Sequence, residues 1–390
     1  MLEKIREYLK KSEAEAWVIY DFASGNPAYR ALLGTAFTTR KCFAVIDREK
    51  TALLICHVID APGVTKAAAA KAYTVATYKT WRELDALLEK HLSPYSTVMM
   101  EISEGGLLPR ASYVDYGTVR SVERFVGRVI SSADLFQALT AVFDGESLEL
   151  HKKAALLIDR IKDEAFARIS ADVKDKGRAD EYEIQQYICR RFAEEGMVTD
   201  GPPIVAAGKN GNSPHYEPTA ERHSPILPGD SVLIDLWARM DHPKAVFADV
   251  TWMGYVGERV PEDLQRAFDT VHHAISAALR FLEEELPRRT VCGYEVDDVC
   301  NGILTENGYG DYILHRTGHS MSVGESDHGV GVNIDNFETH DTRTLMDGLA
   351  FSLEPAVYLP TFGLREEINV YIKDQRPCVY TPRQDKILLL

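Results

Sequence analysis

The sequence lacks the features of several protein classes. It contains no continuous apolar stretch of about 18 residues, the length that a membrane-spanning helix needs. Residues 1–10 mix both charge signs, so we expect an amphipathic helix there and not a signal peptide. Basic side chains number 44 against 59 acidic ones, a formal net charge of −15 over 390 residues. A surface of that sign repels phosphate backbones, which argues against nucleic acid as the main partner.

Cysteines and signature motifs are also sparse. The six cysteines are scattered without a Cys-x-x-Cys pair, which is typical of reduced thiols in a cytoplasmic protein. The chain has no Gly-x-Ser-x-Gly elbow, no Walker-type phosphate loop and no Gly-x-Gly-x-x-Gly fingerprint after a strand. It therefore lacks the marks of an elbow-type serine hydrolase, a P-loop enzyme and a dinucleotide-binding domain. We expect a cytoplasmic protein that is not bound to a membrane.

The chain is long enough for two domains, and its hydrophobic content of 45% can build a substantial core. Its first third alternates short apolar runs with helical stretches such as Trp81–His91, which predicts a small α/β domain. Turn residues and a helix N-cap between Ser131 and Ser147 then precede a long charged helix. We place the boundary there, with an N-terminal domain at 1–138 and a second domain at 139–390.

The second domain reads as helices and strands that do not alternate strictly. This arrangement favours an α+β domain in which helices pack on a mostly antiparallel sheet. Beyond the long helix after Ser147, the expected helices are Asp180–Glu195, Glu262–Leu282 and Tyr294–Asn307, and the expected strands are Ser231–Trp237, Phe247–Met253, Leu349–Leu353 and Ile368–Ile372.

Five potential metal ligands lie in or beside these strand-like runs: Asp235, Asp249, His319, Glu354 and Glu367. A carboxylate in a buried strand needs a partner, and taken singly such a residue is more often a hydrogen-bonded structural one. Four converging carboxylates repel each other, and two divalent cations would balance their charge. Oxygen ligands with one imidazole suit Mn²⁺, Fe²⁺, Co²⁺ or Zn²⁺. We therefore expect a two-metal site if the five converge, which spacing alone does not establish.

Histidines gather around the same runs. His315 and His319 are four residues apart, but Gly318 and the β-branched and hydroxyl neighbours favour a strand or loop over a zinc-protease helix. A single histidine is more often a surface or satisfied core residue. Their density between two strand carboxylates favours a functional role.

These residues stand in motifs that resemble the pita-bread metallopeptidase family, which includes Xaa-Pro dipeptidase (prolidase), aminopeptidase P, methionine aminopeptidase and the metal-free creatinase. The resemblance covers most of the chain. It implies an α+β pita-bread catalytic domain with a smaller, α/β, creatinase-like N-terminal domain. The motifs are Asp235-Leu-Trp, Asp249-Val-Thr, His315-Arg-Thr-Gly-His319, Ser352-Leu-Glu354-Pro-Ala-Val-Tyr-Leu-Pro360 and Arg365-Glu-Glu367.

The resemblance also implies a role for each ligand candidate. The counterpart of Asp235 binds one metal, those of Asp249 and Glu367 bridge both metals, and those of His319 and Glu354 bind the second. A metal-bridging hydroxide is then the expected nucleophile, and Glu354 is the expected proton shuttle.

Four further residues match catalytic positions of the family. His215, in Ser213-Pro-His215-Tyr-Glu-Pro218, resembles its substrate-side histidine, and His315 and His328 resemble the two that steady the carbonyl and the tetrahedral intermediate. Arg365 matches the arginine that orients a ligand or the substrate.

The sequence departs from the family pattern at several positions. Trp237 stands where glycine is usual, Trp252 where arginine is common, and Ser320-Met-Ser322 replaces a glycine-containing pattern. His328 lies two residues further from His319 than is commonest in the family. A bulky tryptophan near the metals is expected to narrow the pocket.

The resemblance predicts a homodimeric hydrolase that holds two divalent ions, Mn²⁺ first among them, and cleaves Xaa-Pro bonds in dipeptides or short peptides. One alternative is an enzyme of the same fold that acts on a small non-peptide metabolite, as a lyase or C–N hydrolase. Another is a non-catalytic binding protein.

Overall fold

The computed structural model of the chain describes residues 1–34, 37–69 and 71–390. These residues form two compact units, Met1–Thr140 and Ala141–Leu390. Among the described helices, none has the length and apolarity to cross a membrane.

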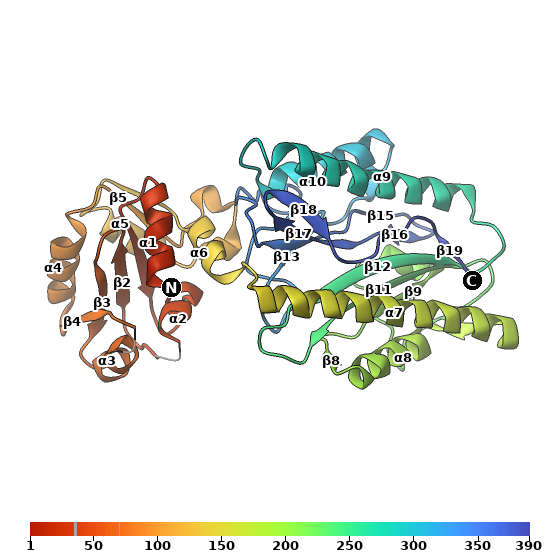
Figure 1. The fold of residues 1–390 in the computed structure, drawn as a ribbon, viewed down its shortest axis with the longest axis horizontal. Helices are drawn as coiled ribbons and strands as arrows, with labels where there is room; N and C mark the ends of the chain where they lie inside the picture. The colour runs from red at the N-terminus through yellow and green to blue at the C-terminus, as the bar shows by residue number, and fades with distance from the viewer. Residues whose placement is uncertain (35–36, 70) are drawn as a thin grey trace. The chain divides into compact units, whose positions relative to one another are not determined.

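Unit 1 is an α/β unit around a mixed six-stranded sheet with strand order β4-β3-β2-β1-β5-β6 (Figure 1). Apolar side chains of α1, α2, α3 and α6 pack on one face of the sheet, and those of α4 and α5 on the other. The strands are β1 (Ala16–Asp21), β2 (Cys42–Asp47), β3 (Ala52–His57), β4 (Thr74–Tyr78), β5 (Thr97–Met100) and β6 (Arg128–Ser131). The helices are α1 (Leu2–Lys11), α2 (Pro27–Leu33), α3 (Ala61–Ala69), α4 (Trp81–Leu92), α5 (Tyr116–Val122) and α6 (Ala133–Thr140).

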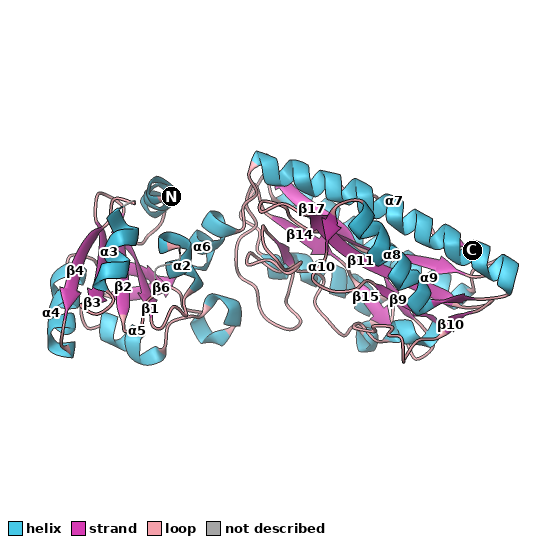
Figure 2. Ribbon diagram, turned by 90° about the horizontal axis from the view of Figure 1, so that it is seen from below, coloured by secondary structure: helices cyan, strands magenta, loops and turns pink. Residues whose placement is uncertain are grey.

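Unit 2 places sheets between two pairs of helices, which confirms the predicted α+β class. One sheet has the order β19-β12-β11-β8, with β9 also on β11, and a second has the order β13-β14-β17-β18. In Figure 1, α7 and α8 lie on one side of these strands and α9 and α10 on the other; Figure 2 shows α7 running along them. The helices are α7 (Gly145–Lys176), α8 (Glu181–Glu194), α9 (Glu262–Glu285) and α10 (Gly293–Glu306).

The strands of unit 2 are short apart from two. The long pair is β11 (Ser231–Met240) and β12 (Ala248–Tyr255). The others are β7 (Ala179–Asp180), β8 (Met197–Val198), β9 (Ile204–Ala207), β10 (Pro225–Ile226), β13 (Ser320–Met321), β14 (Ala350–Leu353), β15 (Ala356–Tyr358), β16 (Gly363–Arg365), β17 (Ile368–Lys373), β18 (Arg376–Val379) and β19 (Leu388–Leu389).

The long helix α7 begins where the sequence predicts an N-cap. The Asp144 side chain accepts a hydrogen bond from the backbone N–H of Ser147 at 2.8 Å, which satisfies one of the free amides of the first turn. The helix ends at Gly177, whose φ of 75° is the left-handed conformation that glycine adopts without strain. Its buried face packs against α8 and the outer face of β11.

Strand alternation decides which side chains of β11 face the interior of the unit. Ile234 and Leu236 pack with α7 and α8, whereas Leu233 belongs to the apolar cluster of α9 and α10. Because successive side chains point to opposite faces, Asp235 and Trp237 lie on the same side as Leu233. This face of β11 and β12 carries the candidate site.

Candidate metal centre

The structure brings the five predicted ligands together from five places in the chain. Asp235 lies on β11, Asp249 on β12, His319 just before β13, Glu354 just after β14, and Glu367 between β16 and β17. Their exposed fractions are 7% for Asp235, 4% for Asp249, 3% for His319 and 2% for Glu367, and Glu354 is half-buried. Ligand atoms of Asp249, His319 and Glu367 lie within 4.8 Å of one another, Glu354 lies 3.6 Å from His319, and Asp235 interacts electrostatically with Asp249 and Glu354.

His319 directs one ring nitrogen at two carboxylates. Its Nε2 lies 3.6 Å from Asp249 Oδ2 and 3.6 Å from Glu354 Oε1. Its Nδ1 donates a hydrogen bond to the backbone oxygen of Ser320 at 3.1 Å, so the Nε2 lone pair is left to face the carboxylates. Metal-bound histidines characteristically use the second ring nitrogen in this way. A cation held between this nitrogen and the two carboxylates would have all three as ligands.

Two carboxylate oxygens in the same place are buried without a hydrogen-bond partner. They are Asp249 Oδ1 and Glu367 Oε1, among the described residues. Ligand atoms of Asp249, His319 and Glu367 lie within 4.8 Å of one another. An unpartnered buried acceptor is costly, and a bound divalent cation would remove that cost for both oxygens. The donor set therefore fits a metal ion.

The protonation equilibria of the cluster favour the same conclusion. Burial and the charge of Asp235 raise the pKa of Asp249 well above its usual value. Burial and the charge of Asp249 do the same for Glu367. Burial also raises the pKa of Asp235, although the Arg365 guanidinium opposes it. Without a cation these carboxyls tend to hold protons, and a divalent ion would replace those protons.

Glu354 behaves differently from the other carboxyls. Burial disfavours its ionised form, but electrostatic interactions with His319, His315 and the Arg365 guanidinium outweigh burial and lower its pKa. The hydroxyl of Ser352 donates to Glu354 Oε1 at 3.1 Å, and the backbone N–H of His319 donates to the Ser352 hydroxyl oxygen at 2.9 Å. One serine thus orients both residues.

Arg365 connects Asp235 to a tyrosine and a histidine. Its guanidinium forms an ion pair with Asp235 and donates to the Tyr358 hydroxyl at 3.1 Å and to Thr251 Oγ1 at 3.0 Å. The Nδ1 of His315 donates to a backbone oxygen at 2.7 Å, so its Nε2 accepts the Tyr358 O–H at 2.7 Å. Burial lowers the pKa of His315, which keeps this tautomer neutral.

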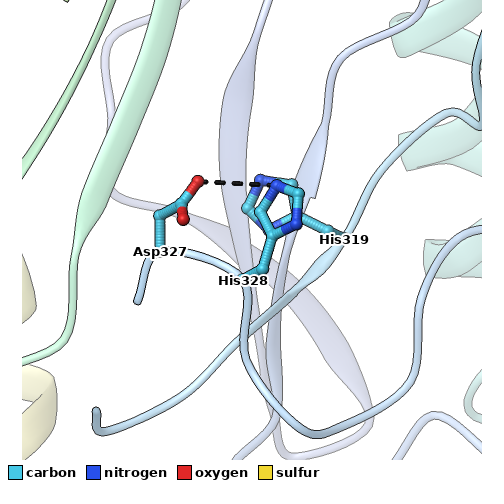
Figure 3. A group of neighbouring side chains, drawn as sticks. All are labelled: His319, Asp327 and His328. Atoms are coloured by element: carbon cyan, nitrogen blue, oxygen red, sulfur yellow. Dashed lines mark ion pairs between the residues drawn. The ribbon is translucent and has the colours of Figure 1, made fainter. Parts of the chain in front are cut away.

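The His328 ring contacts the ring of His319, a proposed ligand, at a tilt of 33°, and Asp327 lies beside His328 (Figure 3). The rings of His328 and His319 lie 4.1 Å apart between centroids. Asp327 Oδ2 lies 3.5 Å from His328 Nε2. Ligand atoms of these three residues also lie within 4.8 Å of one another. The sequence analysis missed Asp327, although its place next to His328 was an available signal.

The fold places two residues, His215 and Glu366, in positions that the local sequence pattern does not reveal. His215 is exposed in the loop after η3 (Gly208–Asn212), and among the described residues no hydrogen bond or ion pair joins it to the ligand candidates. Glu366, beside Glu367, turns away to pair with His272 at 3.0 Å and with Arg383 at 3.3 Å.

The expectation that a tryptophan narrows the pocket is wrong for Trp252. Its indole packs with the apolar side chains of α7 and α8, on the opposite face of β12 from Asp249. The ammonium of the buried Lys162 lies 3.1 Å above the ring centroid. Trp252 therefore belongs to the core on the outer side of the sheet.

Supporting residues that the sequence analysis missed lie between the two sheets. Asn369 on β17 accepts a hydrogen bond from the backbone N–H of Asp249 at 2.9 Å and donates to its backbone oxygen at 2.8 Å. Thr251 donates to Glu367 Oε2 at 2.8 Å. Both sets of contacts join β12 to the second sheet beside the candidate metal ligands. Both also join residues more than a hundred positions apart in the chain, so no local sequence pattern indicates them.

Comparison with known proteins agrees with this geometry. The sequence model of metallopeptidase family M24 matches residues 149–374, more than half of the chain, and this range contains all five ligand candidates. The Xaa-Pro dipeptidase of Lactobacillus helveticus is 30% identical over 215 residues, 54% of this chain and 51% of that protein. The Xaa-Pro dipeptidase of Lactobacillus delbrueckii is 31% identical over 198 residues, 49% and 48% respectively. The chain thus spans about half the length of the curated relatives that it matches.

Solved structures share the whole fold. The dipeptidase PepE from Mycobacterium ulcerans has a TM-score of 0.64 at 20% identity and covers 100% of this chain and 96% of its own. The prolidase from Pyrococcus horikoshii has a TM-score of 0.58 at 21% identity, with 99% of each chain covered. These similarities confirm the predicted pita-bread fold class. Because the family model matches more than half of the chain and spans its buried cluster of carboxylates and histidine, the chain belongs to metallopeptidase family M24.

Proposed function

We propose that the chain is a metal-dependent peptidase that hydrolyses Xaa-Pro bonds in dipeptides or short peptides. The observation that carries the proposal is the convergence of Asp249, His319 and Glu367, with two buried oxygens that lack hydrogen-bond partners. The substrate class is supported by relatives that are named Xaa-Pro dipeptidases.

The proposed centre holds two divalent ions, with Mn²⁺ as the first candidate and Co²⁺, Zn²⁺ and Fe²⁺ as the others. Asp235 would bind one ion, Asp249 and Glu367 would bridge both, and His319 and Glu354 would bind the second. Four carboxylates balance the charge of two such ions, and oxygen donors with one imidazole suit these metals. When bound, the ions would supply Lewis acidity toward the scissile carbonyl and would activate water.

The protein groups around the ions would position substrate and move protons. Glu354, kept ionised by its cationic neighbours and oriented by Ser352, would accept a proton from water and return it to the leaving amide nitrogen. His315, whose Nε2 contacts the Tyr358 hydroxyl in the metal-free chain, would steady the substrate carbonyl from one side in its protonated form, as an Nε2–H donor. Arg365 would keep Asp235 ionised and oriented.

Two histidines have less defined places in the proposal. His328, whose ring contacts that of His319, would steady the tetrahedral intermediate, and the exposed His215 would contact the substrate from its loop. We further propose that residues 1–138 form a creatinase-like N-terminal domain beside a catalytic domain at 139–390, and that the protein is a cytoplasmic homodimer.

The proposal is tested by elemental analysis of protein purified without chelator, together with hydrolysis of an Xaa-Pro dipeptide panel after addition of Mn²⁺, Co²⁺ or Zn²⁺. About two ions per chain with proline-dependent cleavage would support it. Two bound ions without cleavage of any dipeptide would favour the alternative that the enzyme acts on a small non-peptide substrate. Absence of metal binding would overturn the proposed function. Asp249→Ala should lose metal and activity while the fold is kept, whereas the exposed Asp241→Ala should lose neither.

A further inference from the structure

We propose that Trp237 determines the specificity of this peptidase by limiting the size of the residue that precedes proline, and that Asp200 holds the indole in place. This inference rests on the proposed function. The side chain of Trp237 forms one wall of the site, and Asp200 acts only through it as a positioning residue.

The register of β11 and β12 sets Trp237 beside the candidate metal ligands. Trp237 pairs directly with Asp249 on β12, and it follows Asp235 by two residues on the same face of β11. Cβ atoms of directly opposed residues lie about 5 Å apart, and residues two apart along a strand about 7 Å apart. The half-buried indole therefore borders the space in front of both carboxylates.

The indole is fixed on three sides. Its Nε1 donates a hydrogen bond to Asp200 Oδ1 at 2.6 Å. Its Cζ2 lies 3.1 Å from the position that a Cβ on Gly201 would take, so the chain at Gly201 packs closely against the ring. Buried apolar side chains that include Phe143 and Phe247 border it elsewhere. These contacts oppose a rotation of the ring that would make room for a bulky substrate group.

The same aspartate connects the indole to the loop that carries His328. Asp200 Oδ2 accepts a hydrogen bond from the backbone N–H of Asp327 at 3.3 Å, while Oδ1 holds Trp237. Asp327 in turn pairs with His328, whose ring contacts that of His319. One carboxylate thus contacts both the Trp237 indole on β11 and the loop at the opposite border of the site.

The charges along β11 indicate which end of a dipeptide meets the indole. Asp200 and Asp327 lie at the Trp237 end, whereas the chain of contacts from Arg365 to Tyr358 and His315 begins at Asp235. The ammonium of a zwitterionic dipeptide is favoured near the two aspartates, and its carboxylate is favoured away from them. The N-terminal residue, which precedes proline, then lies against Trp237.

The test compares kcat/KM for Ala-Pro and Phe-Pro in the Mn²⁺-loaded full chain. Trp237→Ala should raise the ratio of kcat/KM for Phe-Pro to kcat/KM for Ala-Pro by about tenfold or more. Additional room for an apolar substrate group in a pocket changes kcat/KM by about this factor. Asp200→Ala should shift the ratio in the same direction. Asp200→Asn, whose amide oxygen can still accept the indole N–H, should stay near the wild-type ratio. The matched control is Trp81→Ala, an exposed tryptophan of unit 1.

Two further readouts separate specificity from general damage. Mn²⁺ content should be the same in wild type and in Trp237→Ala. Asp200→Ala should add nothing to the ratio when Trp237 is already alanine, because a positioning residue acts only through its target. Full additivity of the two substitutions would overturn the assigned role of Asp200.

The outcomes distinguish this inference from the function on which it rests. A wild type that cleaves the panel, with an unchanged ratio in Trp237→Ala, would overturn the specificity role and leave the peptidase proposal standing. A wild type that cleaves no Xaa-Pro dipeptide would overturn the proposed function, and the assigned specificity would fall with it.

Discussion

Glu367→Gln should stabilise the metal-free protein and weaken its stabilisation by Mn²⁺. Glu367 Oε1 and Asp249 Oδ1 are buried acceptors without partners, and ligand atoms of the two residues lie within 4.8 Å of each other. A glutamine amide can donate toward Asp249 while its oxygen keeps the bond from Thr251. Relief of one unsatisfied buried acceptor is worth about 1 kcal/mol or somewhat more. For a unit of this size that is a rise in melting temperature of about 2–4 °C.

The assay is thermal unfolding with EDTA and with Mn²⁺. Wild type at a Mn²⁺ concentration 100 times its Kd should gain about 2.7 kcal/mol, whereas the variant should gain much less because it has lost a bridging carboxylate. Since the pKa of Glu367 is raised in the folded state, the advantage of the variant in EDTA should grow as pH rises.

The neighbouring residue provides the control for this experiment. Glu366 is buried as well but pairs with His272 and Arg383, so Glu366→Gln should lower stability in both conditions and keep the full Mn²⁺ response. A Glu367→Gln protein that melts below wild type in EDTA, or that keeps the wild-type Mn²⁺ shift, would refute the assignment of these oxygens to a metal.

Three other substitutions test separate parts of the structure. Gly363→Ala places a Cβ 1.6 Å from the Gly211 backbone oxygen, so it should lower the free energy of unfolding by more than about 2 kcal/mol, measured by denaturant titration. Its control is Gly302→Ala in α10, where the added Cβ meets open space and should slightly raise the free energy of unfolding. Burial raises the pKa of Glu101 from 4.5 to about 7, so between these two pH values the folded state holds a proton that the unfolded state releases. The free energy of unfolding of unit 1 should therefore fall by about 3 kcal/mol as pH rises through that interval. Glu101→Gln should not show this fall. Tyr358→Phe removes the hydroxyl between the arginine and the histidine, and should lower kcat/KM for Ala-Pro by about tenfold or more with Mn²⁺ content kept.

Much of the fold is readable from local pattern. The apolar spacing and the N-cap at Asp144 predict α7, and the runs around Asp235 and Asp249 predict β11 and β12. Periodicity succeeds here because a helix or strand that packs on one core must repeat its apolar residues at a fixed interval. The five ligand candidates follow from carboxylates in apolar runs and from motif resemblance.

Local sequence pattern did not predict which face of the sheet a side chain lies on, or which distant residues pair with each other. Whether a tryptophan borders the site depends on the face of its strand, and a shift of one residue in the register of β12 would bring Trp252 to the face that carries Trp237. Glu366 and Glu367 differ for the same reason. Asp327 joins the site only because its loop folds back over His319.

The sequence by itself therefore determined the elements, the α+β class and the ligand candidates, because each depends on residues that are close together in the chain. Only the tertiary structure decided that Asp249 and Glu367 each leave a buried oxygen without a partner, and that Asp200 reaches both Trp237 and Asp327. Such contacts join segments far apart in the chain, and they exist only after the two sheets have packed together.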